Sequence, residues 1–177
     1  RLDAEFAEFA KSKAEAGATW EEVELPEDAD AASLAGWVEK HPKNFPGWRR
    51  YAAKLVVEQK WPEAKAALPK YQALVPDYVG EENAYMLLAE VNRKTGDAPG
   101  ERAALEELAA RDGDAAPVFD RLIGLAKGDG DWQAVAINAR RLLAVNPLVP
   151  EPHRALAEAA EHQGLRDEAV SSARALA

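Results

Sequence analysis

The chain has 177 residues, of which 47% are hydrophobic, and it carries a net charge of −9. This acidic balance argues against nucleic acids and anionic membrane surfaces as partners, because both are bound through clustered Lys and Arg. The sequence contains no Cys, which excludes disulfides and thiolate chemistry without deciding the compartment, and no apolar run approaches membrane-spanning length.

Residues 1–29 are predicted to hold a helix and an acidic connector. Apolar side chains recur at helical spacing from Leu2 to Phe9, and Gly17 can end this helix. The remainder, up to residue 29, is rich in acids and is expected to be extended, and Trp20 within it has no structural assignment. Because the chain starts without an initiator Met and stops inside a helical pattern, we expect it to be a piece of a longer protein.

Residues 30–177 are predicted to form one repeat domain, because several markers recur every 34 residues. Pro42 and Pro76 each close an apolar helix and lie 34 residues apart. Gly130 and Gly164 lie in equivalent turns with the same separation. Such a period is typical of helix pairs, none of which can bury its apolar face without stacking on a neighbour.

The period predicts a solitary helix followed by four helix pairs. The solitary helix covers residues 30–42, with Asp30 as its N-cap. The four pairs cover about residues 45–78, 81–113, 116–149 and 150–177, the last being truncated. Four of the five Trp side chains are assigned to core positions: Trp37, Trp48, Trp61 and Trp132.

The second pair departs from the pattern. Its helices are expected at about 83–95 and 99–111, but Glu101 falls where the other pairs have a small residue, and Gly113 replaces the closing Pro. We therefore expect a locally shifted second helix in this pair.

No pattern for catalysis, metal binding or a cofactor is found. The three His residues lack the spacing that places two imidazoles on one helical face, and His41, His153 and His162 fit helix ends or packing positions. The two Asp-Gly-Asp sequences lack the acidic residue at the twelfth position of a calcium loop and are better interpreted as turns. The chain is therefore expected not to be an enzyme.

Residues 48–76 contain Trp48-x₂-Tyr51-Ala52-x₂-Leu55, then Ala64-x₃-Leu68 and Pro76, and related spacings start at Phe119 and His153. Over roughly residues 30–177 the chain thus resembles the tetratricopeptide repeat family. The resemblance implies an all-α fold, an α-α superhelix of antiparallel helix pairs whose first helices line a concave face. The expected partner is a protein or peptide, bound there as an extended peptide or a helix.

On that face, the first and fifth positions after the aromatic marker are implied to point inwards. The resulting candidates are Arg49, Ala53, Met86, Glu90, Asp120, Gly124, Arg154 and Glu158. Some family members bind a C-terminal carboxylate with Lys and Asn at such positions, but that pair is missing here. The alternative that these side chains are merely solvated stays open, as does a purely structural spacer without a ligand.

A narrower resemblance concerns four segments: 41–45 (His-Pro-Lys-Asn-Phe), 101–108 (Glu-Arg-Ala-Ala-Leu-Glu-Glu-Leu), 130–132 (Gly-Asp-Trp) and 144–148 (Ala-Val-Asn-Pro-Leu). They look like the helical repeat region that follows a gluzincin-type zinc peptidase domain in some large bacterial proteins. This resemblance implies a catalytic domain N-terminal to Arg1 and makes another domain of the same polypeptide a second possible partner. Self-association is a third expectation, through the apolar repeat end at Leu165, Val170 and Leu176.

Overall fold

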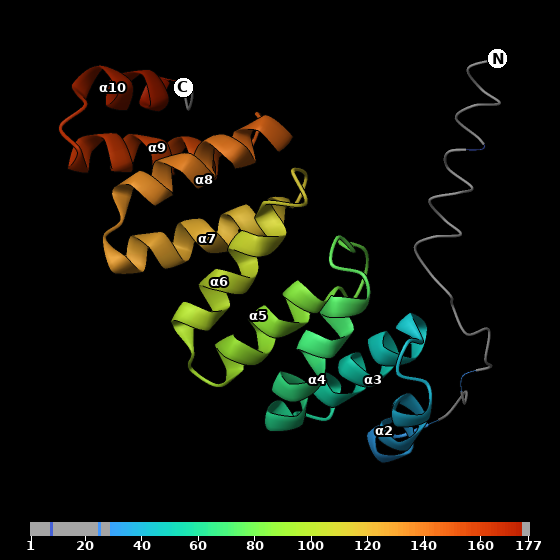
Figure 1. Cartoon of the computed structure of the whole chain (residues 1–177). Coiled ribbons are helices and arrows are strands. Elements are labelled where there is room, and N and C mark those ends of the chain that lie inside the picture. Colours follow the sequence, from blue (N-terminus) through green and yellow to red (C-terminus); the bar gives the residue numbers. More distant parts are fainter. Residues whose placement is uncertain (1–7, 9–24, 26–28, 175–177) are drawn as a thin grey trace. The chain divides into compact units, whose positions relative to one another are not determined.

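In the computed structural model, the described residues are 29–174 together with Glu8 and Leu25. The predictions of a helix near the N-terminus, of the connector and of an unassigned Trp20 therefore concern residues outside this range, as does Leu176. The described part is all-α, with nine helices and no strand (Figure 1). The helices are α2 (Ala31–Lys40), α3 (Phe45–Val57), α4 (Trp61–Leu74), α5 (Ala84–Lys94), α6 (Ala98–Ala109), α7 (Ala116–Asp129), α8 (Trp132–Val145), α9 (Pro150–His162) and α10 (Arg166–Arg174).

The chain divides into two compact units, residues 1–76 and 77–177. In unit 1, α3 packs against both α2 and α4. In unit 2, the pairs α5–α6, α7–α8 and α9–α10 pack within themselves, and α6 and α8 also contact the helix that follows. Each described helix thus buries its apolar side against a neighbour in the same unit, as repeat architectures require.

Two helices of unit 1 begin at N-caps with side-chain hydrogen bonds. Asp30 accepts a hydrogen bond from the Ser33 amide at 2.8 Å, as predicted for the N-cap of α2. Asn44 caps α3 in the same way, through the Gly47 amide at 2.8 Å. The core behind these caps contains large buried side chains: Leu34, Val38, Leu55, Leu68 and Tyr71.

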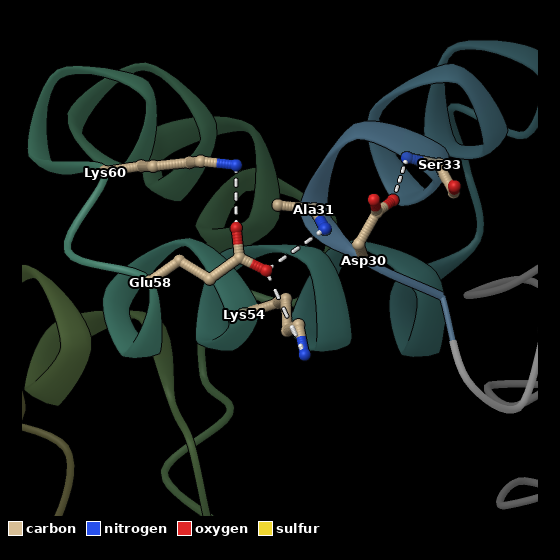
Figure 2. A network of polar contacts seen from close by, with 6 residues as sticks. All are labelled: Asp30, Ala31, Ser33, Lys54, Glu58 and Lys60. Carbon is tan, nitrogen blue, oxygen red and sulfur yellow. Dashed lines mark hydrogen bonds and ion pairs between the residues drawn. The ribbon is translucent and has the colours of Figure 1, made fainter.

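A polar network joins the start of α2 to the turn between α3 and α4 (Figure 2). The Glu58 carboxylate lies 2.7 Å from Lys60 Nζ and 3.9 Å from Lys54 Nζ. It also accepts a hydrogen bond from the Ala31 amide at 3.4 Å. Because amides at a helix N-terminus have no intrahelical partner, this carboxylate provides α2 with an acceptor from another helix.

In unit 2, the turn inside each helix pair contains a glycine with a positive φ. Gly96, Gly130 and Gly164 have φ values of 74°, 71° and 73°, a left-handed conformation that glycine adopts without steric cost. The predictions for Gly130 and Gly164 are confirmed. The core of this unit is continuous across all three pairs, from Tyr85 of α5 to Ala159 of α9.

The predicted register shift in the second pair is wrong. α6 begins at Ala98 and α8 at Trp132, which keeps the period of 34 residues. Glu101 therefore takes the position that Val135 has in α8, and it is only 3% exposed. The helix tolerates this buried acid without shifting because a cation from α7 neutralises it, as described below.

The prediction that four Trp side chains are core residues is only partly right. Trp48 is buried, whereas Trp37, Trp61 and Trp132 are half-buried. Trp37 lies across Gly47, where an added Cβ would come within 2.3 Å of the indole ring. These rings cover the edges of the core and do not fill it.

Candidate functional site

The side chains predicted to bind a partner do not gather at one place. In unit 1, Arg49 and Ala53 of α3 are both half-buried. In unit 2, Asp120 and Gly124 of α7 are exposed. The other four lie on α5 and α9 and have distinct surroundings.

The two residues on α5 line a hollow of about 300 Å³ in unit 2, which we call the α5–α7 hollow. α5, α6 and α7 all contribute to its lining. The lining residues are Met86, Leu87, Ala89, Glu90, Arg93, Glu101, Leu105, Pro117 and Arg121. Since α5 and α7 are the first helices of consecutive pairs, the hollow lies on the side where the sequence predicted binding.

The walls of the α5–α7 hollow are mainly apolar. Met86 is 41% exposed, and its unbranched thioether side chain can adapt to ligands of different shape. Leu105 of α6 is buried, and Pro117 contributes from the first turn of α7. A concave apolar surface with a few charged groups is the usual form of a binding site.

A bidentate ion pair between Arg121 and Glu101 lines the α5–α7 hollow. Arg121 donates through Nε to Glu101 Oε1 at 2.6 Å and through Nη2 to Glu101 Oε2 at 3.0 Å. These hydrogen bonds raise the pKa of the Arg121 guanidinium above its ordinary value. The Glu101 side chain is 5% exposed and that of Arg121 is 46% exposed, so the carboxylate holds the guanidinium in one orientation at the surface.

Two other charged side chains line the α5–α7 hollow. Glu90 and Arg93 both come from α5. In the part of the chain that the structure describes, neither forms an ion pair or a side-chain hydrogen bond. They are therefore available to polar groups of a ligand.

The candidates on α9 are engaged in ion pairs. Arg154 lies 3.4 Å from Glu151 of the same helix. Glu158 forms an ion pair with Lys127 of α7. This second pair joins the first helices of the third and fourth pairs, so Glu158 contributes to stacking.

The other residues that line the hollow were not predicted as binding candidates: Leu87, Ala89, Arg93, Glu101, Leu105, Pro117 and Arg121. The prediction covered only two positions on each first helix, whereas the hollow also takes side chains from α6 and from the start of α7. One signal was present. An acid at a position that is small and apolar in the other pairs requires a neighbouring cation, and Arg121 is a basic residue on the next helix.

The His residues occupy structural positions, as predicted. His41 caps α2 and lies against the Trp37 ring, with ring centroids 4.4 Å apart. His162 stacks on Trp132 at 3.8 Å. His153 approaches the carbonyl oxygen of Pro147 at 3.2 Å.

The described residues contain neither a cluster of metal-binding side chains nor a membrane-spanning helix. Over residues 29–174 and the two isolated described positions, no three His, Asp or Glu side chains are grouped closely enough to hold a metal ion. None of the helices in this same part of the chain has the length and apolar character needed to cross a membrane.

No protein-family model matches the sequence, and no curated protein matches it either. Among solved structures, the crystal structure of MamA protein is similar, with a TM-score of 0.62 and 18% identity over 82% of this chain and 78% of that chain. A structure of MamA residues 41 to the end, from Desulfovibrio magneticus RS-1, has a TM-score of 0.57 and 15% identity over 82% and 78% of the two chains. At these identities the likeness is one of fold. The chain has an all-α, tetratricopeptide-like fold of the α-α superhelix class.

Proposed function

We propose that this chain is a non-catalytic protein-interaction module that binds an extended peptide or a helix of a partner protein. The binding side is that of the first helices, and the α5–α7 hollow receives one large apolar side chain of the partner. One observation carries the proposal: on this side of unit 2 lies a hollow of about 300 Å³, whose lining combines apolar and charged side chains.

The charges around the α5–α7 hollow support a protein ligand. A peptide backbone offers both hydrogen-bond donors and acceptors. Glu90 can accept from its amides, while Arg93 and the free edge of Arg121 can donate to its carbonyl groups. Apolar contact supplies most of the affinity in such a site, and the polar groups fix the ligand's orientation.

The test uses the full chain as bait in a native lysate, with a photo-crosslinking amino acid at position 86. The matched control carries the crosslinker at Gln133, an exposed position of α8. We expect one partner to crosslink at position 86 and not at 133, and Met86→Glu, but not Gln133→Glu, to abolish its recovery. Equal recovery by both variants, or no crosslink at position 86, would contradict the proposal.

A second proposal rests on the four segments that resemble the repeat region of large bacterial proteins. It assigns the chain to a region that positions substrate for, or packs against, a gluzincin-type zinc peptidase domain. The coding sequence upstream of Arg1 tests it directly. An upstream helix with the motif H-E-x-x-H would support this assignment, because that spacing places two His ligands on one helical face. An upstream sequence without that motif would remove it.

A further inference from the structure

Unit 1 contains a second hollow, which has no part in the function proposed above. It has a volume of about 180 Å³ and lies among α2, α3 and α4. We call it the Trp48 hollow. α3 contributes Trp48 and Tyr51, α2 contributes Glu39, and α4 contributes Glu63 and Lys70. Four small or medium apolar side chains of α2 and α4 complete the lining.

The two carboxylates of this hollow are available to a ligand. Glu39 and Glu63 are exposed, and within the described residues neither has a hydrogen-bond or ion-pair partner. They come from different helices, α2 and α4, and the negative charge of each affects the Tyr51 phenol. The pKa of Tyr51 is raised, first by burial of its hydroxyl and then by the negative charges of Glu63 and Glu39. The hydroxyl itself has no hydrogen-bond partner within the described residues.

The aromatic side chains of the Trp48 hollow are held in place. The Trp48 indole N–H donates to the Pro42 carbonyl oxygen at 3.0 Å, which fixes the ring plane. Tyr51 meets this ring edge-on, with centroids 6.0 Å apart and an interplanar angle of 63°. The ammonium of Lys70 lies 5.6 Å from the Trp48 ring centroid. The Lys70 ammonium thus lies within cation–π range of Trp48, which is itself only 7% exposed.

We propose that the Trp48 hollow binds the guanidinium group of an arginine side chain from a partner protein. Two carboxylates, a phenol oxygen and an indole face complement a planar cation, because guanidinium donates several hydrogen bonds in its plane and stacks through its face. Lysine fits less well, since its compact ammonium cannot use both modes together. In this arrangement Lys70 is an internal competitor that a bound arginine displaces from the indole.

This inference does not depend on the proposed function. The Trp48 hollow and the α5–α7 hollow belong to different units and share no residue. A partner that uses only one of them leaves the other proposal unaffected.

The test titrates the full chain with N-acetyl-arginine amide and follows the Trp48 indole N–H and the amides of α2–α4 by NMR. N-acetyl-citrulline amide is the matched uncharged probe, and N-acetyl-lysine amide is the compact cation. We expect saturable shifts with the arginine probe that weaken as salt is added, smaller effects with lysine and none with citrulline.

Variants make the assignment specific. Glu39→Gln and Glu63→Gln should each weaken arginine binding by roughly two- to fivefold, as expected for exposed charge pairs. Glu106→Gln, an exposed acid of α6, is the control and should leave binding unchanged. Lys70→Gln should strengthen binding, because it removes the competing ammonium.

Several results would overturn the proposal. In the titrations, these are NMR shifts with the citrulline probe equal to those with arginine, equal affinity for the lysine and arginine probes, or no saturable shift of the Trp48 indole N–H. Among the variants, it is an unchanged arginine affinity in both Glu39→Gln and Glu63→Gln. A weaker affinity in Lys70→Gln would also contradict it.

Discussion

Gln59 adopts the left-handed backbone conformation, which in the turns of unit 2 is adopted by glycine. Its φ is 56°, whereas Gly96, Gly130 and Gly164 hold the corresponding turns inside their helix pairs. A residue with a Cβ in the left-handed region costs about 1–2 kcal/mol, part of which is recovered because it restricts the unfolded chain. We therefore expect Gln59→Gly to raise the free energy of unfolding by up to about 1 kcal/mol, measured by urea denaturation.

Gly130→Ala is the reciprocal control for this prediction. A Cβ at Gly130 would have no other atom within 4 Å, so only the backbone conformation resists the substitution. We expect it to destabilise the chain by about 1 kcal/mol. If both variants shifted stability in the same direction, the strain assigned to Gln59 would be wrong.

At the scale of elements, α2 depends on two carboxylates that are charged at neutral pH. Hydrogen bonds from the Ser33 backbone and side chain lower the pKa of Asp30, and a hydrogen bond from Lys60 lowers that of Glu58 (Figure 2). A depressed pKa means that the stabilisation is present above the ordinary value and is lost as the pH falls through the folded-state value. The attachment of α2 should therefore weaken in acid, below the ordinary Glu value of 4.5.

Thermal unfolding of Glu58→Gln at several pH values measures this effect. We expect the variant to melt at a lower temperature than the parent chain at pH 7, and the difference to shrink as the pH falls below the ordinary Glu value of 4.5, because Glu58 of the parent then takes up a proton. Glu106→Gln provides the comparison, since this exposed acid has no ion-pair or side-chain hydrogen-bond partner among the described residues. A melting difference that persists unchanged at pH 3 would show that the Glu58 charge is not responsible.

The junction of α6 and α7 depends on the pair between Glu101 and Arg121. Removal of Arg121 leaves the buried carboxylate without a partner, which costs about 3–5 kcal/mol for a fully buried pair and less here because Arg121 is half exposed. We expect Arg121→Ala to destabilise the chain by about 1–3 kcal/mol in urea denaturation. The double variant Glu101→Val with Arg121→Ala should recover most of this loss, because Val is the residue that α8 carries at the equivalent position.

The two variants separate two explanations of the α6–α7 junction. A loss in the double variant as large as that in Arg121→Ala would mean that the guanidinium stabilises through its own packing. If the double variant recovers the lost stability, the destabilisation in Arg121→Ala comes from the buried Glu101 carboxylate that has lost its partner.

At the scale of the whole molecule, each compact unit has its own buried core. Trp48 is 7% exposed and belongs to unit 1, so Trp48→Ala should destabilise that unit by about 3–5 kcal/mol. Amide hydrogen exchange measures this locally. We expect residues 29–76 to lose protection and residues 77–174 to keep most of theirs. Val57→Ala, at an exposed position of α3, should change neither. A near-neutral effect of Trp48→Ala would contradict its assignment to the core.

The helices could be predicted from the sequence because Pro and Gly mark their ends at a fixed period. Pro42, Pro76, Gly130 and Gly164 each follow within two residues the end of a helix: α2, α4, α7 and α9, respectively. Glu101 could not be placed, because the pattern assumes that a charge excludes burial, whereas a cation 20 residues later makes burial possible. The burial of the Trp side chains was overestimated for a similar reason: the period gives the side of a helix that faces inwards, not the depth of each ring.

The positions expected to bind a partner remain a prediction, and the structure gives them different surroundings. Met86 and Glu90 lie at the α5–α7 hollow, but Arg154 and Glu158 are occupied by ion pairs. A repeat pattern fixes which positions are equivalent, and the side chains at those positions differ from pair to pair. Which of these side chains form a cavity depends on neighbours from other helices. The repeat pattern of a single helix does not predict those neighbours.

The pair of Glu101 and Arg121 also sets the order in which the lining of the α5–α7 hollow could be re-engineered. A library that randomises Arg121 first would start from chains destabilised by about 1–3 kcal/mol, because most members leave the buried Glu101 carboxylate without a partner. Replacing Glu101 with Val beforehand removes the acid that demands a cation and leaves position 121 free to vary.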